Sequence, residues 1–169
     1  VENTDVTVSG NSKKSNFRVS FNKWNEEGVI ESSGLARHTV RANFDSKISS
    51  KFRTGLRLNI SERNIEHNKI NINNLFQNTL EVKPIYKDDG ITYTDSNPYS
   101  ASPEQNLFAD INDKIDHSNI TNAIANTYFE YDINDHVTLR TTYGVDYNWL
   151  KRKTYLPSIL PQRLSGNLG

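Results

Sequence analysis

The sequence predicts an all-β protein: an antiparallel meander of about six long strands in the wall of a large transmembrane β-barrel, with one long extracellular loop containing a short helix. Residues 136–149 alternate apolar and polar side chains and end in the aromatic pair Tyr147 and Trp149. A strand points successive side chains to opposite faces, so this segment has one apolar and one polar face. It exceeds the five or six residues of an average soluble strand and reaches the roughly nine to eleven that span a bilayer at a tilt.

Period-two alternation also predicts four strands in the first part of the chain, near residues 5–9, 16–24, 37–45 and 52–61. The first and second strands are separated by a short polar turn at 10–15, and the third and fourth by another at 46–51. A longer connection, residues 25–36, separates the two pairs. This spacing is typical of hairpins joined into a meander.

The alternation stops between residues 62 and 117. Residues 71–80 have apolar side chains at helical spacing, and Pro84 follows, so a short helix is predicted there. An irregular segment of this length is unusual in a compact soluble domain. It is expected on the extracellular side of an outer-membrane barrel, where loops are long.

Two more strands are predicted near residues 118–133 and 136–149, joined by the tight turn Asn134-Asp135. Short and long connections then alternate along the whole chain, as in a meander whose two ends face different environments. About six strands are too few to close a transmembrane barrel, which needs at least about eight. The chain is therefore interpreted as a piece of something larger.

The amino-acid composition argues against several classes of protein. Lys+Arg and Asp+Glu are both 20, so the net charge is zero and nothing favours nucleic-acid binding. The chain has no cysteine and no apolar run long enough for a transmembrane helix. A mean hydropathy of −0.72 still suits barrel strands, whose lumen face is polar. No leader follows Val1, which indicates either a cytosolic chain or a removed N-terminus.

No nucleophile, acid–base pair, nucleotide loop or metal-ligand spacing is present, so no enzyme activity, cofactor or metal is predicted. The polar face instead carries six arginines: Arg18, Arg37, Arg41, Arg53, Arg57 and Arg140. Two interpretations remain open for them, contact with anionic groups of a substrate or plug, and pairing with carboxylates across the lumen. A register slip of one residue would turn several of them into lipid, at about 2–4 kcal/mol each, so register is strongly specified.

Seven local sequences, in this order, resemble those of SusC/RagA-like TonB-dependent transporters: residues 8–17 (VSGNSKKSNF), 24–30 (WNEEGVI), 37–45 (RHTVRANFD), 84–90 (PIYKDDG), 97–98 (NP), 127–131 (TYFEY) and 143–147 (YGVDY). The resemblance covers nearly the whole chain. It implies that residues 1–169 are early strands of a plugged barrel of about 22 strands in the Gram-negative outer membrane of Bacteroidetes-type bacteria. The plug and the remaining barrel are outside this sequence.

The resemblance further implies import of glycans or peptides, with a SusD-like surface lipoprotein as a lid, TonB acting through the plug region, and outer-membrane lipid around the wall. The predicted substrate contacts are Trp24, Arg37, Tyr86, Tyr93, Tyr99 and Tyr155. Trp24 is placed either in the lumen near the outer rim or in the aromatic girdle, and the four tyrosines are placed in loops that contact ligand or pack internally.

Two alternatives to a transporter segment are considered from the same residues. A soluble β-sandwich or adhesin-like binding module would show the same alternation, with the apolar face as its core. A β-rich hydrolase domain is disfavoured because no catalytic constellation is visible.

Overall fold

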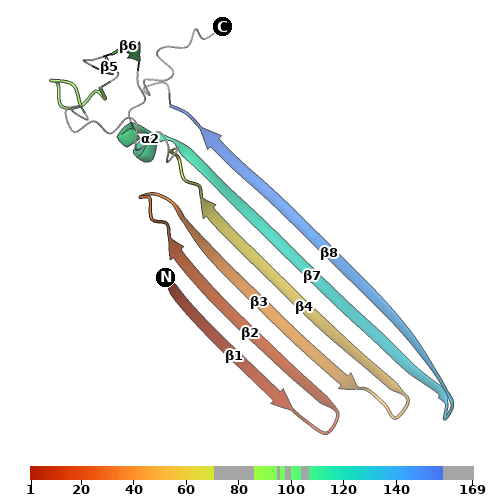
Figure 1. Cartoon of the computed structure of the whole chain (residues 1–169). Coiled ribbons are helices and arrows are strands. Elements are labelled where there is room, and N and C mark those ends of the chain that lie inside the picture. The colour runs from red at the N-terminus through yellow and green to blue at the C-terminus, as the bar shows by residue number, and fades with distance from the viewer. Residues whose placement is uncertain (71–85, 95, 98–99, 104–106, 158–169) are drawn as a thin grey trace. The chain divides into compact units, whose positions relative to one another are not determined.

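The computed structural model describes residues 1–70, 86–94, 96–97, 100–103 and 107–157. Six strands form one antiparallel sheet in the order β1-β2-β3-β4-β7-β8, so strands that follow one another along the sheet also follow one another in the chain (Figure 1). The six strands are β1 (Glu2–Asn11), β2 (Ser15–Glu27), β3 (Gly34–Lys47), β4 (Phe52–Glu66), β7 (Ile115–Asn134) and β8 (Val137–Tyr155). The predicted fold class, an all-β meander of six strands, is confirmed.

Each strand is longer than its alternation pattern predicted, and this corrects the boundaries. The clearest cases are β4, which continues to Glu66, and β8, which continues to Tyr155. Alternation marks only the part of a strand where the outward side chains are apolar. Backbone pairing with neighbouring strands continues beyond that part, where polar side chains such as Lys151 and Lys153 replace the apolar ones. Tyr155 therefore ends a strand rather than lying in a loop.

The pairing of β1 with β2 sets the two faces of the sheet. Val8 lies opposite Val19 and Gly10 opposite Phe17 on one face, whereas Ser9 lies opposite Arg18 on the other. A Cβ at Gly10 would lie 2.5 Å from the Phe17 ring, so a larger residue at this position would force that ring to move. The turn is closed by Ser12, whose amide donates to the Ser15 carbonyl oxygen over 2.7 Å.

The apolar face of the sheet is exposed. Val8, Tyr143 and Val145 keep 59, 61 and 64 % of their surface. Aromatic rings contact one another along this face, with the Phe129 ring 6.3 Å from both the Phe52 and the Tyr143 ring. Within the described residues no second sheet covers these side chains, and the only other sheet is the small pair β5 (Ser96–Asn97) and β6 (Ser100–Pro103). Within the described residues this face is therefore not the core of a sandwich, and an apolar face of this size is typical of a surface that contacts a membrane or another protein.

Chain contacts separate a second unit from the sheet, made of the described parts of residues 27–34, 66–117 and 152–169. It holds β5, β6, the helix α2 (Leu107–Asp113) and a β-bridge between Tyr86 and Tyr93. The helix predicted at 71–80 lies outside the described residues. The sequence did not predict α2, whose seven residues are too few to show helical periodicity. No helix in the described part of the chain has the length and hydropathy needed to cross a membrane.

Candidate functional site

The polar face of the sheet carries a network of charged side chains at the end where the short turns lie. Its members, here called the ionic lattice, are Asp45, Arg53, Arg57, Tyr128, Glu130, Asp132 and Arg140. Arg53 donates to Glu130 over 2.9 Å and to both Asp132 carboxylate oxygens over 2.9 Å. Arg140 donates to the other Glu130 oxygen over 3.1 Å. One arginine of β4 is thus bonded to two carboxylates of β7, and both of these also accept from β8, since the Thr138 hydroxyl donates to Asp132 over 2.7 Å.

A second part of the ionic lattice centres on Asp45 of β3. Arg57 donates to both Asp45 carboxylate oxygens over 2.9 and 2.7 Å, and the Tyr128 hydroxyl donates to one of them over 2.9 Å. The Arg140 guanidinium lies 4.6 Å from the centre of the Tyr128 ring. Bidentate arginine–carboxylate pairs fix geometry as well as charge. The ionic lattice therefore ties four adjacent strands together on the polar face.

Gly55 makes room for this arrangement. It is buried in β4 on the polar face, and a Cβ at this position would overlap the Tyr128 ring and lie 2.5 Å from an Asp45 oxygen. The ring of Tyr128 therefore crosses directly over the β4 backbone to reach Asp45. A side chain at position 55 would exclude that path.

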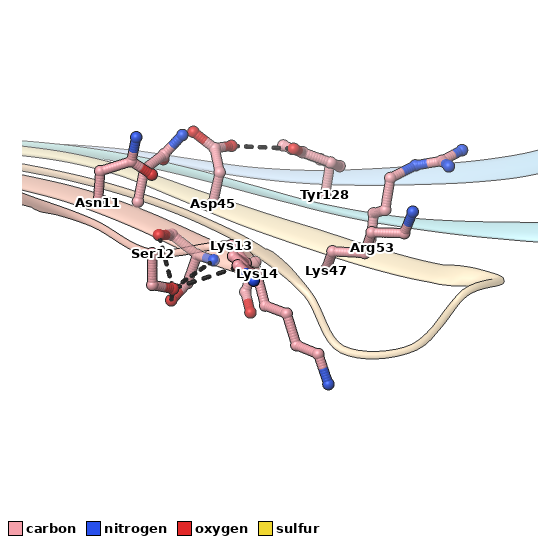
Figure 2. A pocket seen from close by; sticks show the side chains of 11 residues that line it. Asn11, Ser12, Lys13, Lys14, Asp45, Lys47, Arg53 and Tyr128 are labelled. Atoms are coloured by element: carbon pink, nitrogen blue, oxygen red, sulfur yellow. Dashed lines mark hydrogen bonds between the residues drawn. The ribbon is translucent and has the colours of Figure 1, made fainter.

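A pocket of about 250 Å³ opens beside the ionic lattice at the β1–β2 turn. Figure 2 shows the hydrogen bond between Asp45 and Tyr128 near Arg53 and the turn residues. Three lysines line the pocket, namely Lys13, Lys14 and Lys47. The amide of Lys47 also donates to the Lys14 carbonyl oxygen over 2.6 Å, which joins this turn to β3.

Two predicted substrate contacts, Trp24 and Arg37, meet at the other end of the polar face. The Arg37 guanidinium carbon lies 5.6 Å from the centre of the Trp24 indole, and the indole N–H donates to Glu26 over 3.3 Å. The Nε atom of Arg37 is buried and has no hydrogen-bond partner among the described residues. Both side chains lie on the polar side of the sheet, so Trp24 is on the face opposite the apolar one.

The predicted tyrosines lie elsewhere, and Tyr99 is outside the described residues. Tyr155 ends β8 and is exposed. Tyr86 and Tyr93 stack with ring centres 5.3 Å apart across a hairpin in the second unit. Burial, together with the hydrogen bond to Asp113, raises the pKa of Tyr93 to about 12.

The tip of that hairpin is organised by Asp89. Its carboxylate accepts hydrogen bonds from the Thr92 hydroxyl and from the amides of Ile91 and Thr92 over 2.5, 2.9 and 2.8 Å. These bonds, that of the Thr92 hydroxyl first, lower the pKa of Asp89 to about 2. The aspartate thereby forms the local turn that its residue type favours.

Sequence reasoning identified the arginines of the polar face but not their partners. Arg53, Arg57 and Arg140 pair with carboxylates on neighbouring strands of the sheet. One of the two interpretations of these arginines was pairing with carboxylates, but across the lumen rather than between adjacent strands. The missed members of the ionic lattice are Asp45, Tyr128, Glu130 and Asp132. Their signal was present, since all four occupy positions of polar-face parity, but strand pairing was needed to show which arginine each one meets.

Two curated proteins are similar to this chain in sequence, and no family model matches it. The chain is 27 % identical over 164 residues to TonB-dependent receptor P26 of Formosa agariphila, a match that covers 97 % of this chain and 16 % of that protein. It is 36 % identical over 56 residues to TonB-dependent receptor P3 of the same organism, covering 33 % of this chain and 6 % of that one. The chain thus spans a small part of the length of these relatives.

Two solved structures of the RagAB peptide importer share the fold. The open-open state matches with a TM-score of 0.64 at 19 % identity, over 90 % of this chain and 18 % of that one. The closed-closed state matches with a TM-score of 0.63 at 17 % identity, over 92 and 18 %. The six-stranded meander therefore has the fold of part of that barrel.

Proposed function

We propose that this chain, which is related to TonB-dependent receptors, forms an early part of the wall and extracellular loops of a transporter that imports glycans or peptides. The relationship indicates an outer-membrane β-barrel and a non-enzymatic role. Residues 1–169 would be part of the barrel domain, after a plug that they do not include.

The observation that carries the proposal is the contrast between the two faces of one long-stranded sheet. Large apolar side chains are exposed on one face, and bonded charges cover the other. In a bilayer the apolar face lies against lipid, and the polar face lies against water in the lumen. Every backbone group in the hydrocarbon must be bonded, since each unsatisfied one costs several kcal/mol, and a closed sheet meets that demand.

The long connections would supply contacts with cargo and partners. Trp24 and Arg37 lie on the polar face, and Tyr86, Tyr93 and Tyr99 come between β4 and β7 in the sequence. Tyr155 at the end of β8 is the sixth proposed contact. Amphipathic aromatic rings suit both sugar and peptide surfaces.

The proposed partners are a SusD-like surface lipoprotein above the loops, TonB through the plug region, and outer-membrane lipid around the wall. The structural match to a protein described as a peptide importer supports peptide as one cargo class. Glycan cargo remains the other class.

Thiol labelling in intact cells tests the proposed wall. The chain has no cysteine, so introduced thiols are unique within it. Asp146→Cys and Val145→Cys are adjacent in β8 but belong to opposite faces. We expect a membrane-impermeant maleimide to label Asp146→Cys, and only a lipid-soluble one to label Val145→Cys. Equal labelling of both by the impermeant reagent would contradict a lipid-facing surface.

Transport itself is tested by growth and uptake. Cells lacking the whole protein should lose uptake of either a labelled oligosaccharide mixture or a labelled peptide mixture, and the intact gene should restore it. Unchanged uptake of both mixtures in the deletion strain would refute the transporter proposal.

A further inference from the structure

Three arginines make no bond to a carboxylate in the described part of the chain. They lie in the half of the polar face away from the short turns, here called the outer half. These are Arg37 and Arg41 of β3 and Arg63 of β4, here called the outer basic patch. Among the residues that the structure describes, Arg63 donates only to the neutral amide oxygen of Asn122, over 2.9 Å. Arg37 faces the Trp24 ring, with its Nε atom buried and without a partner. Arg41 is exposed and has no hydrogen bond or ion pair to a described residue.

In the half of the same face near the short turns, here called the inner half, three arginines are paired with carboxylates. Arg53, Arg57 and Arg140 each bond to at least one carboxylate of the ionic lattice. These three arginines are therefore paired with carboxylates, as is Arg152 of β8, which donates to both Asp116 oxygens over 2.8 Å, whereas the three arginines of the outer basic patch are not. Arg18 of β2 lies opposite Ser9, close to the β1–β2 turn, and among the described residues it also lacks a carboxylate partner.

The strand pairing brings the patch together. The Thr39 hydroxyl bonds to the Ser61 hydroxyl over 3.3 Å, so these residues of β3 and β4 are neighbours on the polar face. Two residues away in this antiparallel pair, Arg37 lies beside Arg63. Like charges directly opposed across two strands are destabilising. The placement of Arg37 beside Arg63 therefore lowers the stability of the sheet, whereas the ionic lattice pairs opposite charges. An arrangement that lowers the stability of the fold is expected at a functional site such as a ligand-binding surface.

The surroundings of the patch leave its charge uncompensated. Thr39 is buried between Arg37 and Arg41, and the residues across the sheet at this level are the neutral Ser61 and Asn59. Two acidic side chains of the neighbouring strands β1 and β2 have other partners, since Glu26 accepts the Trp24 indole N–H and Asp5 accepts the Thr7 hydroxyl. Neither carboxylate bonds to the patch, which therefore offers three guanidinium groups to a ligand.

We propose that the outer basic patch binds the acidic side chains of an extended peptide during import. This inference rests on the proposed function, because it takes the polar face as the lumen wall. Guanidinium groups bind carboxylates through paired, charge-assisted hydrogen bonds. Arg37 and Arg41 are four residues apart in one strand, which is about 13 Å at the rise of a strand. An extended peptide has the same rise, so two glutamates four residues apart match these two arginines.

Trp24 and Thr39 would act as positioning residues for the patch. The indole face holds the Arg37 guanidinium at 5.6 Å, and the Thr39–Ser61 hydrogen bond keeps β3 and β4 in register between Arg37 and Arg41. A preorganised pair of cations binds an extended acidic segment at a lower entropic cost than two mobile lysines would.

The test uses the whole natural protein, purified in detergent, with calorimetric titration of two short synthetic peptides. One carries two glutamates four residues apart, and the other has glutamines at both positions. We expect the glutamate peptide to bind more tightly, and Arg41→Gln or Arg37→Gln to weaken its binding about tenfold without changing that of the glutamine peptide. Added salt should weaken only the glutamate peptide. Arg41→Lys keeps the charge and should recover part of the affinity.

Arg140→Gln is the matched control. It also removes one polar-face arginine, but Glu130 keeps its bond to Arg53, so binding of the glutamate peptide should be unchanged. Equal affinity of the two peptides for the natural protein, or no loss in Arg41→Gln, would overturn the inference. So would patch-dependent binding of a uronic acid oligosaccharide in place of the glutamate peptide.

The two proposals fail in different ways. A protein that imports peptides without discriminating glutamate from glutamine keeps the proposed function and loses the acidic specificity. A protein whose adjacent β8 thiols are labelled alike loses the lumen itself, and the proposed function with it.

Discussion

Gly55 is the residue on which the ionic lattice depends most directly. The Tyr128 ring occupies the space that a Cβ at position 55 would need. We expect Gly55→Ala to displace Tyr128, break its hydrogen bond to Asp45 and lower the unfolding free energy by about 1–3 kcal/mol, the usual cost of overpacking. Urea unfolding of the protein in lipid vesicles measures this change.

Gly144→Ala is the control for that substitution. The nearest atom to a Cβ at Gly144 is the amide oxygen of Asn126, at 2.9 Å, and this is the end of a flexible side chain. A loss of stability in Gly144→Ala as large as in Gly55→Ala would show that any side chain on this face is harmful, and would remove the special role of the Tyr128 contact.

Asp89 gives the hairpin of residues 86–93 a defined response to acid. Its pKa is about 2 in the folded protein, below the ordinary value of 3.8. The carboxylate therefore stabilises the hairpin fully above pH 3.8, and this contribution is lost as the pH falls toward 2. Thr92→Val removes the hydroxyl donor, and we expect the pKa of Asp89 to rise toward 3.8 in an NMR titration of the labelled carboxyl carbon. A pKa that stays near 2 in this variant would assign the effect to the backbone amides alone.

Among the strands, β8 shows how alternation defines a membrane face. Val145 is exposed on the apolar face, and Thr142 lies on the polar one. We expect Val145→Arg to destabilise the protein in vesicles by about 2–4 kcal/mol, because it places a charge in the hydrocarbon near the midplane. Thr142→Arg adds the same side chain toward water and should change the unfolding free energy little. Similar effects of both substitutions would mean that β8 does not have one face in lipid.

The strands also show where prediction from the sequence ends. Period-two alternation is a local property, so it located all six strands and the side chains of each face before any pairing was known. The strand ends were misplaced because pairing continues where the outward side chains become polar, as in β4 after Ser61 and in β8 after Trp149. The helix α2 was missed because a single short helix carries too little periodicity.

In the molecule as a whole, the sheet has two edges. Among the described residues β1 and β8 each have one strand neighbour, so one row of backbone groups on each has no strand partner. We expect residues 1–169 produced alone to form large assemblies in detergent, which size-exclusion chromatography with light scattering would detect. A monodisperse monomer of 19.3 kDa in water without detergent would contradict both the open edges and the lipid-facing surface.

The order of side chains along short segments was enough to establish the fold class, the two faces of each strand and the resemblance to TonB-dependent transporters. Which arginines are neutralised became known only from the pairing of strands. Arg53 meets Asp132 across 79 positions of sequence, and no local pattern records such a pair. The same pairing leaves Arg37, Arg41 and Arg63 without a carboxylate among the described residues, since the strands beside them present neutral side chains at that level of the sheet.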